Sequence, residues 1–250
     1  MRFASLGSGS RGNGTLVEAD GTCVLLDCGF SVRETERRLG RLGYAGEDLT
    51  AIVVTHEHSD HVRGVAALSR KYALPIWCSH GTAVAARLDG AVHYIDVHEP
   101  LAFGALQVRP FSVPHDAREP CQFVFSDGSA RLGVLTDTGM PTPHIREHLD
   151  GCEALLLEAN HDPDMLALGP YPEALKARVS GNYGHLSNVQ AAKLLEALDR
   201  SRLRHIVAAH LSDKNNTPAL AQLALSGALG CEDNWIQIAS QDAGLDWRSL

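Results

Sequence analysis

A run of six residues, His56-Glu57-His58-Ser59-Asp60-His61, is the part of the sequence best equipped for chemistry. It places three imidazoles and the carboxylate of Asp60 within six positions. A hydrophobic core has no use for such a set, because these groups repel one another or need several buried partners when they are crowded together. Imidazole nitrogens and carboxylate oxygens are the usual ligands of catalytic divalent cations. The run therefore predicts a metal-dependent hydrolase.

The elements around the run favour a fixed geometry. Residues 49–55 are mostly aliphatic and β-branched and predict a buried strand that ends just before the run, and the helical spacing of apolar residues over 62–72 predicts a helix after it. Ligands at the carboxyl end of a strand in an α/β protein face the usual ligand crevice. Three further candidates follow strand-like runs over 108–113, 131–135 and 206–209, namely His115, Asp137 and His210.

Together these residues suffice for two divalent cations. A catalytic metal needs about three protein ligands and an open position for water. The simplest partition gives His56, His58 and His115 to one ion. It gives Asp60, His61 and His210 to the other, and Asp137 bridges both.

At the separation of about 3.5–4 Å that is typical of two-metal sites, a bridging water is acidified to a hydroxide, which we expect to be the nucleophile. Asp60 is thus expected to be a catalytic residue as well as a ligand. His-rich ligation suits Zn(II), while Mn(II) or Fe also fits a mixed set.

Two residues at strand ends are candidates for orienting the ligands. Asp27 and Thr55 each end a strand-like run, and either side chain would fix a ligand histidine through its free ring N–H. Ordinary strand capping explains them equally well, and both interpretations stay open here.

His185 lies apart from the ligand run, in Gly184-His185-Leu186-Ser187-Asn188, directly before an Ala-rich helix that Ser187 or Asn188 caps. A histidine at this position near the metals would donate a proton to a leaving oxygen or stabilise developing charge. We favour this catalytic role over metal ligation. The alternative is a histidine with purely local hydrogen bonds.

Length and composition indicate the domain organisation and the kind of protein. The 250 residues, with 44% hydrophobic content, are expected to form a single domain over 1–250 with a sizeable core. No stretch approaches a membrane span or a signal sequence, so we expect a soluble, cytoplasmic protein without a membrane partner. Six scattered cysteines predict reduced, mostly buried thiols. A net charge of −8 argues against a broad nucleic-acid-binding surface, but two cations supply local positive charge where a phosphodiester binds.

The order of expected elements predicts two α/β halves that face each other. In the first part strands are expected over 2–6, 15–18, 23–27, 49–55 and 75–78, with three or four more between 93 and 136, and helices over 31–42, 62–72 and 82–88. In the second part helices are expected over 141–149, 163–168, 172–179 and 187–198, with strands over 154–158 and 205–209.

The ligand run, with His115, Asp137 and His210 in this order, resembles the metallo-β-lactamase superfamily. Five flanking stretches are more specifically similar to the YycJ (WalJ) family: residues 7–14, Leu157 to Asp162, Tyr171 to Arg178, Gly184 to Asn188, and His210 to Asn216. The resemblance spans nearly the whole chain. It implies an α/β fold, the four-layer αββα sandwich, with a dinuclear site at one edge, and 5′-to-3′ exonuclease action on double-stranded DNA.

Related tRNA-processing enzymes carry a similar Gly-His-Ser/Thr helix start, which supports the proton-donor role of His185. Only 73 residues separate Asp137 from His210, which is too short for the inserted domain of the larger RNA-processing members, so DNA is favoured over RNA as the partner. The oligomeric state stays open. Seven residues are candidates for substrate binding: Ser8, Ser10, Asn13, Asn160, Lys176, Arg178 and Asn215. For the loop over 8–13 a tight glycine turn is the simpler explanation, and both can hold.

Other functions remain in competition. One alternative on the same fold is an RNase, and another is a thioester or lactone hydrolase of the glyoxalase II type, since fold does not settle chemistry. His185, Lys176 and Arg178 suit a phosphate and are unnecessary for an acyl group. A non-catalytic metal-binding signalling protein is a third alternative, but it predicts the loss of some ligands, and none is missing.

Overall fold

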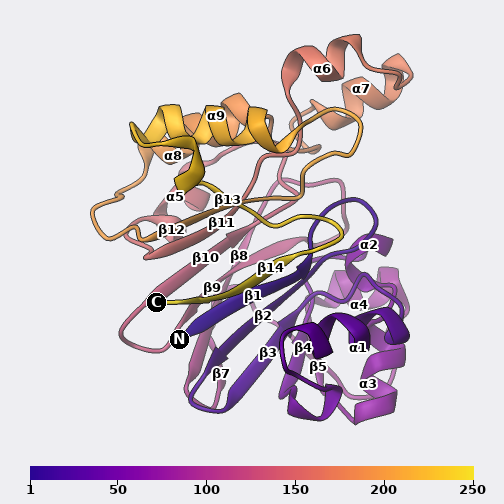
Figure 1. The fold of residues 1–250 in the computed structure, drawn as a ribbon. Coiled ribbons are helices and arrows are strands. Elements are labelled where there is room, and N and C mark those ends of the chain that lie inside the picture. Colours follow the sequence, from indigo (N-terminus) through magenta and orange to yellow (C-terminus); the bar gives the residue numbers. More distant parts are fainter.

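Short apolar strands build two seven-stranded sheets in the computed structural model, which describes residues 1–250 (Figure 1). The first sheet has the order β14-β1-β2-β3-β4-β5-β6 and the second β13-β12-β11-β10-β9-β8-β7. The strands of the first sheet are β1 (Arg2–Gly7), β2 (Gly14–Ala19), β3 (Thr22–Leu26), β4 (Ala51–Val53), β5 (Ile76–Cys78), β6 (Val92–Tyr94) and β14 (Leu245–Ser249). Those of the second are β7 (Leu101–Phe103), β8 (Leu106–Ser112), β9 (Cys121–Ser126), β10 (Arg131–Leu135), β11 (Ala154–Glu158), β12 (His205–Ala209) and β13 (Gln237–Ile238).

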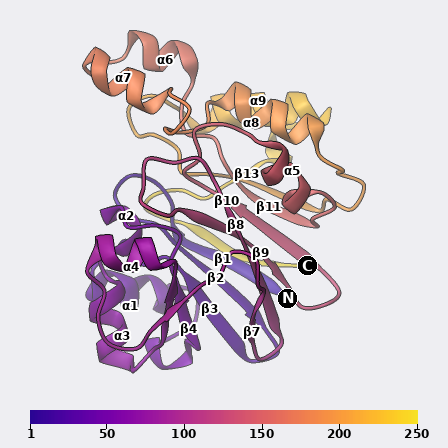
Figure 2. The same cartoon turned by 180° about the vertical axis from the view of Figure 1, so that it is seen from behind.

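Helices cover the outer face of each sheet, so that the molecule has four layers in the order αββα (Figures 1 and 2). The first sheet is covered by α1 (Val32–Arg41), α3 (Val65–Tyr72) and α4 (His80–Ala86), and the second by α5 (Pro143–Leu149), α8 (Asn188–Ala197) and α9 (Pro218–Leu229). The short α2 (Ser59–Val62) lies at the sheet edge, and α6 (Pro163–Leu168) and α7 (Glu173–Val179) form an arm above the layers. Single 3-10 turns span Gly46–Asp48 and Asp233–Trp235.

The core lies mainly between the two sheets. Twenty-two buried residues from both sheets pack there, among them Phe3 and Val24 of the first sheet and Phe123 and Leu156 of the second. Two outer clusters, of 20 and 18 residues, join each sheet to its helices. The αββα sandwich that the resemblance implied is therefore present. No helix is both long and apolar enough to cross a membrane.

Both sheets have the same plan, which determines where a site can form. An antiparallel meander (β1-β2-β3, and β7-β8-β9-β10) passes into parallel strands (β3-β4-β5-β6, and β10-β11-β12-β13). The carboxyl ends of the parallel strands meet at one edge of the sandwich. Ligand sites of open α/β sheets form at such edges.

Several elements differ from those that the sequence predicts. The helix expected over 62–72 is divided into α2 and α3 at Gly64, where an added Cβ would lie 2.1 Å from the carbonyl oxygen of Phe30. Residues 93–136 lie in a region with five strands, β6 to β10, rather than three or four. Helix α9 and strands β13 and β14 were not expected at all.

Candidate metal centre and catalytic pocket

The strand ends bring the seven predicted metal ligands together. His56 follows β4, Asp137 follows β10 and His210 follows β12, while His115 lies in the loop after β8. Helix α2 begins at Ser59, with His58 as its N-cap, and holds Asp60 and His61. Gly29 makes this possible, because a Cβ at that position would lie 1.7 Å from the carbonyl oxygen of Asp60. The loop before α1 therefore closes directly onto the ligand run.

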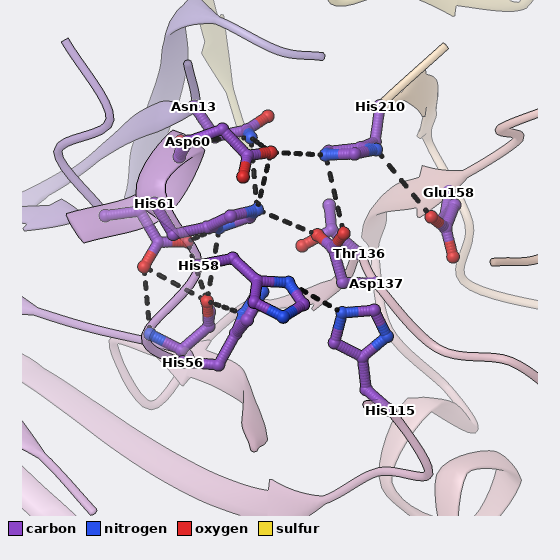
Figure 3. A network of polar contacts seen from close by, with 12 residues as sticks. Asn13, His56, His58, Asp60, His61, His115, Thr136, Asp137, Glu158 and His210 are labelled. Carbon is purple, nitrogen blue, oxygen red and sulfur yellow. Dashed lines mark hydrogen bonds and ion pairs between the residues drawn. The ribbon is translucent and has the colours of Figure 1, made fainter. Parts of the chain in front are cut away.

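The donor atoms form two groups with Asp137 between them (Figure 3). His56, His58 and His115 offer nitrogens within 4.8 Å of one another, and Asp60, His61 and His210 form a second such set. Asp137 groups with His56 and His61, and also with His210, Glu158 and His185, so the last two residues lie within reach of the same centre. Two of these groups contain the residues of the partition that the sequence predicts, and the assignment of ligands to each ion stays a prediction.

Hydrogen bonds fix how the histidines of the first group face the centre. His115 donates through Nδ1 to the carbonyl oxygen of Gly184 at 3.0 Å, which turns its Nε2 toward His58 Nδ1, 3.2 Å away. Thr55 Oγ1 lies 2.9 Å from Nδ1 of His56. Both rings thus point a nitrogen at the centre, as ligand histidines do when their other nitrogen is hydrogen-bonded.

Asp27 orients the second group. Its Oδ2 lies 2.8 Å from His61 Nδ1, and its two oxygens also accept hydrogen bonds from the backbone N–H and the hydroxyl of Thr55. Nε2 of His61 then faces Asp137 Oδ2 at 3.0 Å, although no N–H is aimed at that oxygen. The structure therefore places Asp27 and Thr55 in contact with candidate ligand histidines, rather than only at strand ends.

His210 is held from two sides. Its backbone N–H donates to Ser8 Oγ at 2.9 Å, and the Asn160 amide donates to its carbonyl oxygen at 2.9 Å. Nε2 of His210 then lies 3.3 Å from Asp60 Oδ2 and 3.4 Å from Asp137 Oδ1.

The backbone is strained where the side chains converge. Asp27, Asp137 and His210 have φ values of 61°, 52° and 54°, in the left-handed region. For a residue with a side chain this conformation costs about 1–2 kcal/mol. Such strain collects at functional sites, where the surrounding structure enforces it.

The charges of the donors suit a cation. Burial would raise the pKa of Asp60 and of Asp137, but His61 and His210 overcome it and hold both pKa values well below the ordinary range. Burial holds the pKa of His56 well below its usual value, so that its ring stays neutral. Ionised carboxylates and neutral imidazoles are the forms that bind metals. Burial would lower the pKa of His61 and of His210, but the charge of Asp137 overcomes it and raises both, so these two rings would release a proton when a cation binds.

Two orphaned atoms test whether these residues fit metal ions. His56 Nε2 and Asp137 Oδ2 are buried and have no hydrogen-bond partner. A buried polar atom without a partner costs about 1–3 kcal/mol. Both atoms belong to the donor groups, and nitrogen with oxygen donors in this number suits divalent ions. The residues fit the metals that the sequence predicts.

His185 lies beside the donors in contact with a residue that the sequence analysis did not single out. Its Nδ1 lies 2.8 Å from Oε1 of Glu158, a fully buried carboxylate at the end of β11. Burial would lower the pKa of His185, but the charge and hydrogen bond of Glu158 overcome it and raise the pKa to about 9. A signal was available, because Glu158 is a charged residue that ends an apolar strand run, as Asp27 does.

A pocket of about 170 Å³ opens over this centre. Its wall includes His185, Ser10, Asp116 and Arg178 together with metal-centre residues. Arg178 Nε lies 2.5 Å from Asp116 Oδ2, and Asp116 Oδ1 lies 3.6 Å from His58 Nε2. The ion pair between Arg178 and Asp116 thus lies in the pocket wall beside the first donor group.

The seven predicted substrate-binding residues are divided among several places. Only Ser10 and Arg178 line the pocket over the metal centre. Asn13 is buried, and its amide donates to Asp60 Oδ2 at 3.3 Å, so it braces the ligand loop. The remaining four lie elsewhere: Ser8 and Asn160 behind His210, Asn215 buried beside Ser212, and Lys176 on the other face of α7.

The six cysteines take no part in the site. All are free, and five are buried, as the sequence predicts. Burial raises the pKa of Cys23 to about 12 and that of Cys152 to about 11, so these thiols stay protonated.

Comparisons with known proteins complete the description. The beta-lactamase superfamily domain matches residues 22–210. The chain is 35% identical to exodeoxyribonuclease YycJ of Bacillus anthracis over 92% of this chain and 89% of that protein. It is 32% identical to exodeoxyribonuclease WalJ of Streptococcus pneumoniae over 93% of this chain and 90% of that one. The metallo-beta-lactamase fold protein YhfI from Bacillus subtilis superposes with a TM-score of 0.76 at 15% identity, covering 99% of this chain and 98% of that one, and this likeness shows the fold.

Proposed function

The chain belongs to the family of YycJ and WalJ within the beta-lactamase superfamily, and from this premise we propose that it is an exonuclease that degrades duplex DNA from 5′ ends. That it is a metal-dependent hydrolase follows from the family. The observation that carries the finer proposal is the contact between His185 and Glu158, which places a protonated imidazole on the wall of the pocket above the metal centre.

We propose that two divalent ions, Zn(II) or Mn(II), bind at the two donor groups. His56, His58 and His115 would hold one, Asp60, His61 and His210 would hold the other, and Asp137 lies within reach of donors from both groups. When bound, such ions supply an acidified water and positive charge for a phosphoryl oxygen. Asp60 connects several parts of the site, because its carboxylate accepts a hydrogen bond from the Asn13 amide and also faces His210.

The chain's own residues supply the rest of the chemistry. Nδ1 of His185 is taken by Glu158, so Nε2 carries the proton that can reach a leaving oxygen. Arg178 at the rim offers a guanidinium to a neighbouring phosphate, with Asp116 holding it in place. The charge of bound cations, together with the N–H donors of His185 and Arg178, would favour an anionic phosphodiester over a neutral thioester or lactone.

We also propose that residues 1–250 act as one domain, since a shared core of 22 residues joins the two sheets. Six free cysteines support a reducing compartment such as the cytoplasm. Of the candidate substrate contacts, Ser10 and Arg178 are those that the pocket favours.

The test is the degradation of end-labelled linear duplex DNA, with and without a 5′-phosphate, by protein reconstituted with Zn(II) or Mn(II). We expect stepwise loss from the 5′ end, which is abolished in Asp60→Ala and in His185→Ala. His98→Ala, at an exposed loop histidine, is the matched control and retains activity. Intact DNA alongside cleaved RNA or a hydrolysed thioester would contradict the proposal. The same assay with RNA and with a thioester as substrates therefore decides the substrate class.

A further inference from the structure

A second cavity, of about 530 Å³, lies on the other side of helix α7 from the metal centre. It is formed between the α6–α7 arm and the beginning of α8, which stand close together above the second sheet (Figures 1 and 2). Leu175, Arg178 and Val179 of α7 face the catalytic pocket, whereas Lys176 and Ala177 face this cavity. One thin helix, about 10 Å across, thus separates the two spaces.

His161 on the cavity wall has an unusual environment. Its side chain belongs to a residue that is only 2% exposed, yet neither ring nitrogen makes a hydrogen bond within the protein, and Nδ1 is fully buried. His61, His115 and His185 each have a partner for Nδ1. Because Nδ1 is closed off, a ligand in the cavity can reach the ring only through Nε2, which is not fully buried and has no partner within the protein.

The backbone holds His161 in place. Its carbonyl oxygen accepts a hydrogen bond from the N–H of Asn188 at 2.8 Å, and it forms a bridge with Ser187, the N-cap of α8. The backbone of His161 is therefore fixed against Ser187, which lies two residues after His185 in the sequence. A ligand group at His161 and a reacting group at His185 would be held by two segments that are paired with each other.

The cavity carries no net charge. Burial lowers the pKa of His161 to about 4, so the ring is neutral and offers one donor and one acceptor. Lys176 Nζ is paired with Glu173 Oε1 at 3.0 Å. The walls add apolar carbon from Leu166 and Ala177 and neutral polar groups from Ser180 and Gln190. Such a lining suits a neutral heterocycle with donors and acceptors, and it does not suit a free phosphate.

We propose that this cavity receives a nucleobase of the substrate strand, which His161 recognises by hydrogen bonds. The inference rests on the proposed nuclease function and deepens it, since it gives the enzyme a second contact on the strand beyond the scissile phosphodiester. The volume lies within the range of small-molecule sites, about 300–1,000 Å³. With a base bound in the cavity and a phosphate bound in the catalytic pocket, the DNA strand would lie across α7.

The first experiment couples a change in the protein to a change in the substrate. A duplex carries an abasic nucleotide at one of the first four positions from the 5′ end, and single-turnover rates are compared with those for the intact duplex. At one position we expect the wild type to prefer the intact duplex about tenfold, which corresponds to about 1.4 kcal/mol. His161→Phe should reduce this preference to near unity, and His161→Gln should restore part of it.

Controls separate base recognition from a folding defect. His161→Phe removes no hydrogen bond within the protein, so its melting temperature should not fall below that of the wild type. His98→Phe should keep the tenfold preference. A preference that is the same in His161→Phe as in the wild type would overturn the proposal.

A second experiment needs no catalysis. Metal-free protein with 15N-labelled histidine is titrated with deoxyadenosine, or with deoxyribose 5-phosphate, which has no base. We expect deoxyadenosine alone to shift the His161 ring signals. A shift with deoxyribose 5-phosphate would make the cavity a phosphate site, and deoxyadenosine binding without any abasic effect would make it a site for free nucleosides; either result overturns the proposal. If no DNA is degraded at all, the proposed nuclease function fails, while this titration still tests the cavity.

Discussion

Oε1 of Glu158 lies 2.8 Å from Nδ1 of His185, and both residues are placed by segments that also fix the metal donors. The second oxygen of Glu158 accepts hydrogen bonds from the backbone N–H groups of Thr138 and Leu186. The carboxylate is thus fully occupied and cannot turn away. His185, the proposed proton donor, is thereby held in the pocket wall through its Nδ1.

Glu158→Gln should lower kcat by about 10²–10⁴-fold with little change in KM, because the amide keeps the shape but not the charge that keeps His185 protonated. The double variant with His185→Ala should be no slower than His185→Ala alone. Glu153→Gln changes a buried glutamate at the other end of β11 and should retain kcat. Steady-state kinetics on labelled DNA measure all four proteins, and an unchanged kcat in Glu158→Gln would refute the role.

Asp27→Asn should weaken metal binding about 10–100-fold, since partners that orient a ligand histidine have effects of that size. Asparagine tolerates the left-handed φ of 61° at this position, so the variant removes the charge and not the backbone conformation. Asp20→Asn is the matched control, because Asp20 is exposed and has a φ of 48°. Metal content after dialysis against a graded chelator reports the affinity, and equal retention in both variants would show that Asp27 has no such part.

Arg178→Met should raise KM for DNA about tenfold and reduce the slope of log KM against log salt concentration by about 1, as expected for the loss of one phosphate contact. Arg178 and Arg37 have similarly exposed side chains, at 61% and 62%, and each is paired with a carboxylate. Arg37→Met, on the helix α1, is therefore the control and should leave the slope unchanged. The kinetics are measured between 50 and 200 mM salt, and an unaltered slope in Arg178→Met would exclude a phosphate contact.

Glu34 gives a pH prediction for stability away from the site. The hydrogen bond from Arg37 lowers its pKa, burial opposes this, and Arg38 lowers it further, to about 2. Because the pKa of Glu34 is lower in the folded protein than in the unfolded chain, its ionised carboxylate stabilises the fold above about pH 4.3. This stabilisation is lost as the pH falls toward 2. Wild type should therefore exceed Glu34→Gln in stability by about 1 kcal/mol at pH 7, after solvent screening.

The measurement is urea unfolding of the two metal-free proteins at several pH values. Their difference in free energy of unfolding should shrink as the pH falls from about 5 to about 2. Glu47→Gln, in the first 3-10 turn, is the control and should show no such trend. A difference that stays constant with pH would contradict the ion-pair explanation.

Local signals in the sequence predict where the candidate ligands lie relative to the strands. Strands β11 and β12 begin and end where the apolar runs predict, and the candidate ligands follow such runs in the sequence. The structure brings their donor atoms together, while the partition between two ions stays a prediction. These features depend on residues close together in the chain or on a simple rule of parallel sheets.

Features that depend on distant parts of the chain were not predicted. Strand β14 has only Leu245 and Trp247 as apolar residues, and it is a strand because it pairs with β1, at the other end of the chain. Helix α9 did carry a signal in the sequence, a threonine N-cap followed by Pro218. Because apolar residues are spread evenly over this segment, it lacks the polar face whose spacing indicates an amphipathic helix.

The sequence also did not predict whether polar loop side chains point into the protein or toward the pocket. Asn13, Asn160 and Asn215 are polar residues in loops near the ligands, a pattern that equally fits substrate contact and internal bracing. In the structure all three are buried. Only the packing of loops from both halves of the molecule decides which way such amides face.

The left-handed backbones of Asp27, Asp137 and His210 also bear on how this enzyme can be altered. Glycine adopts that conformation without strain, so a screen of variants for heat resistance alone would favour replacing the side chains that converge on the metal centre. Stability and activity are thus in opposition at these three positions. Thermostable versions are better sought in the outer helices, where the two properties can be varied independently.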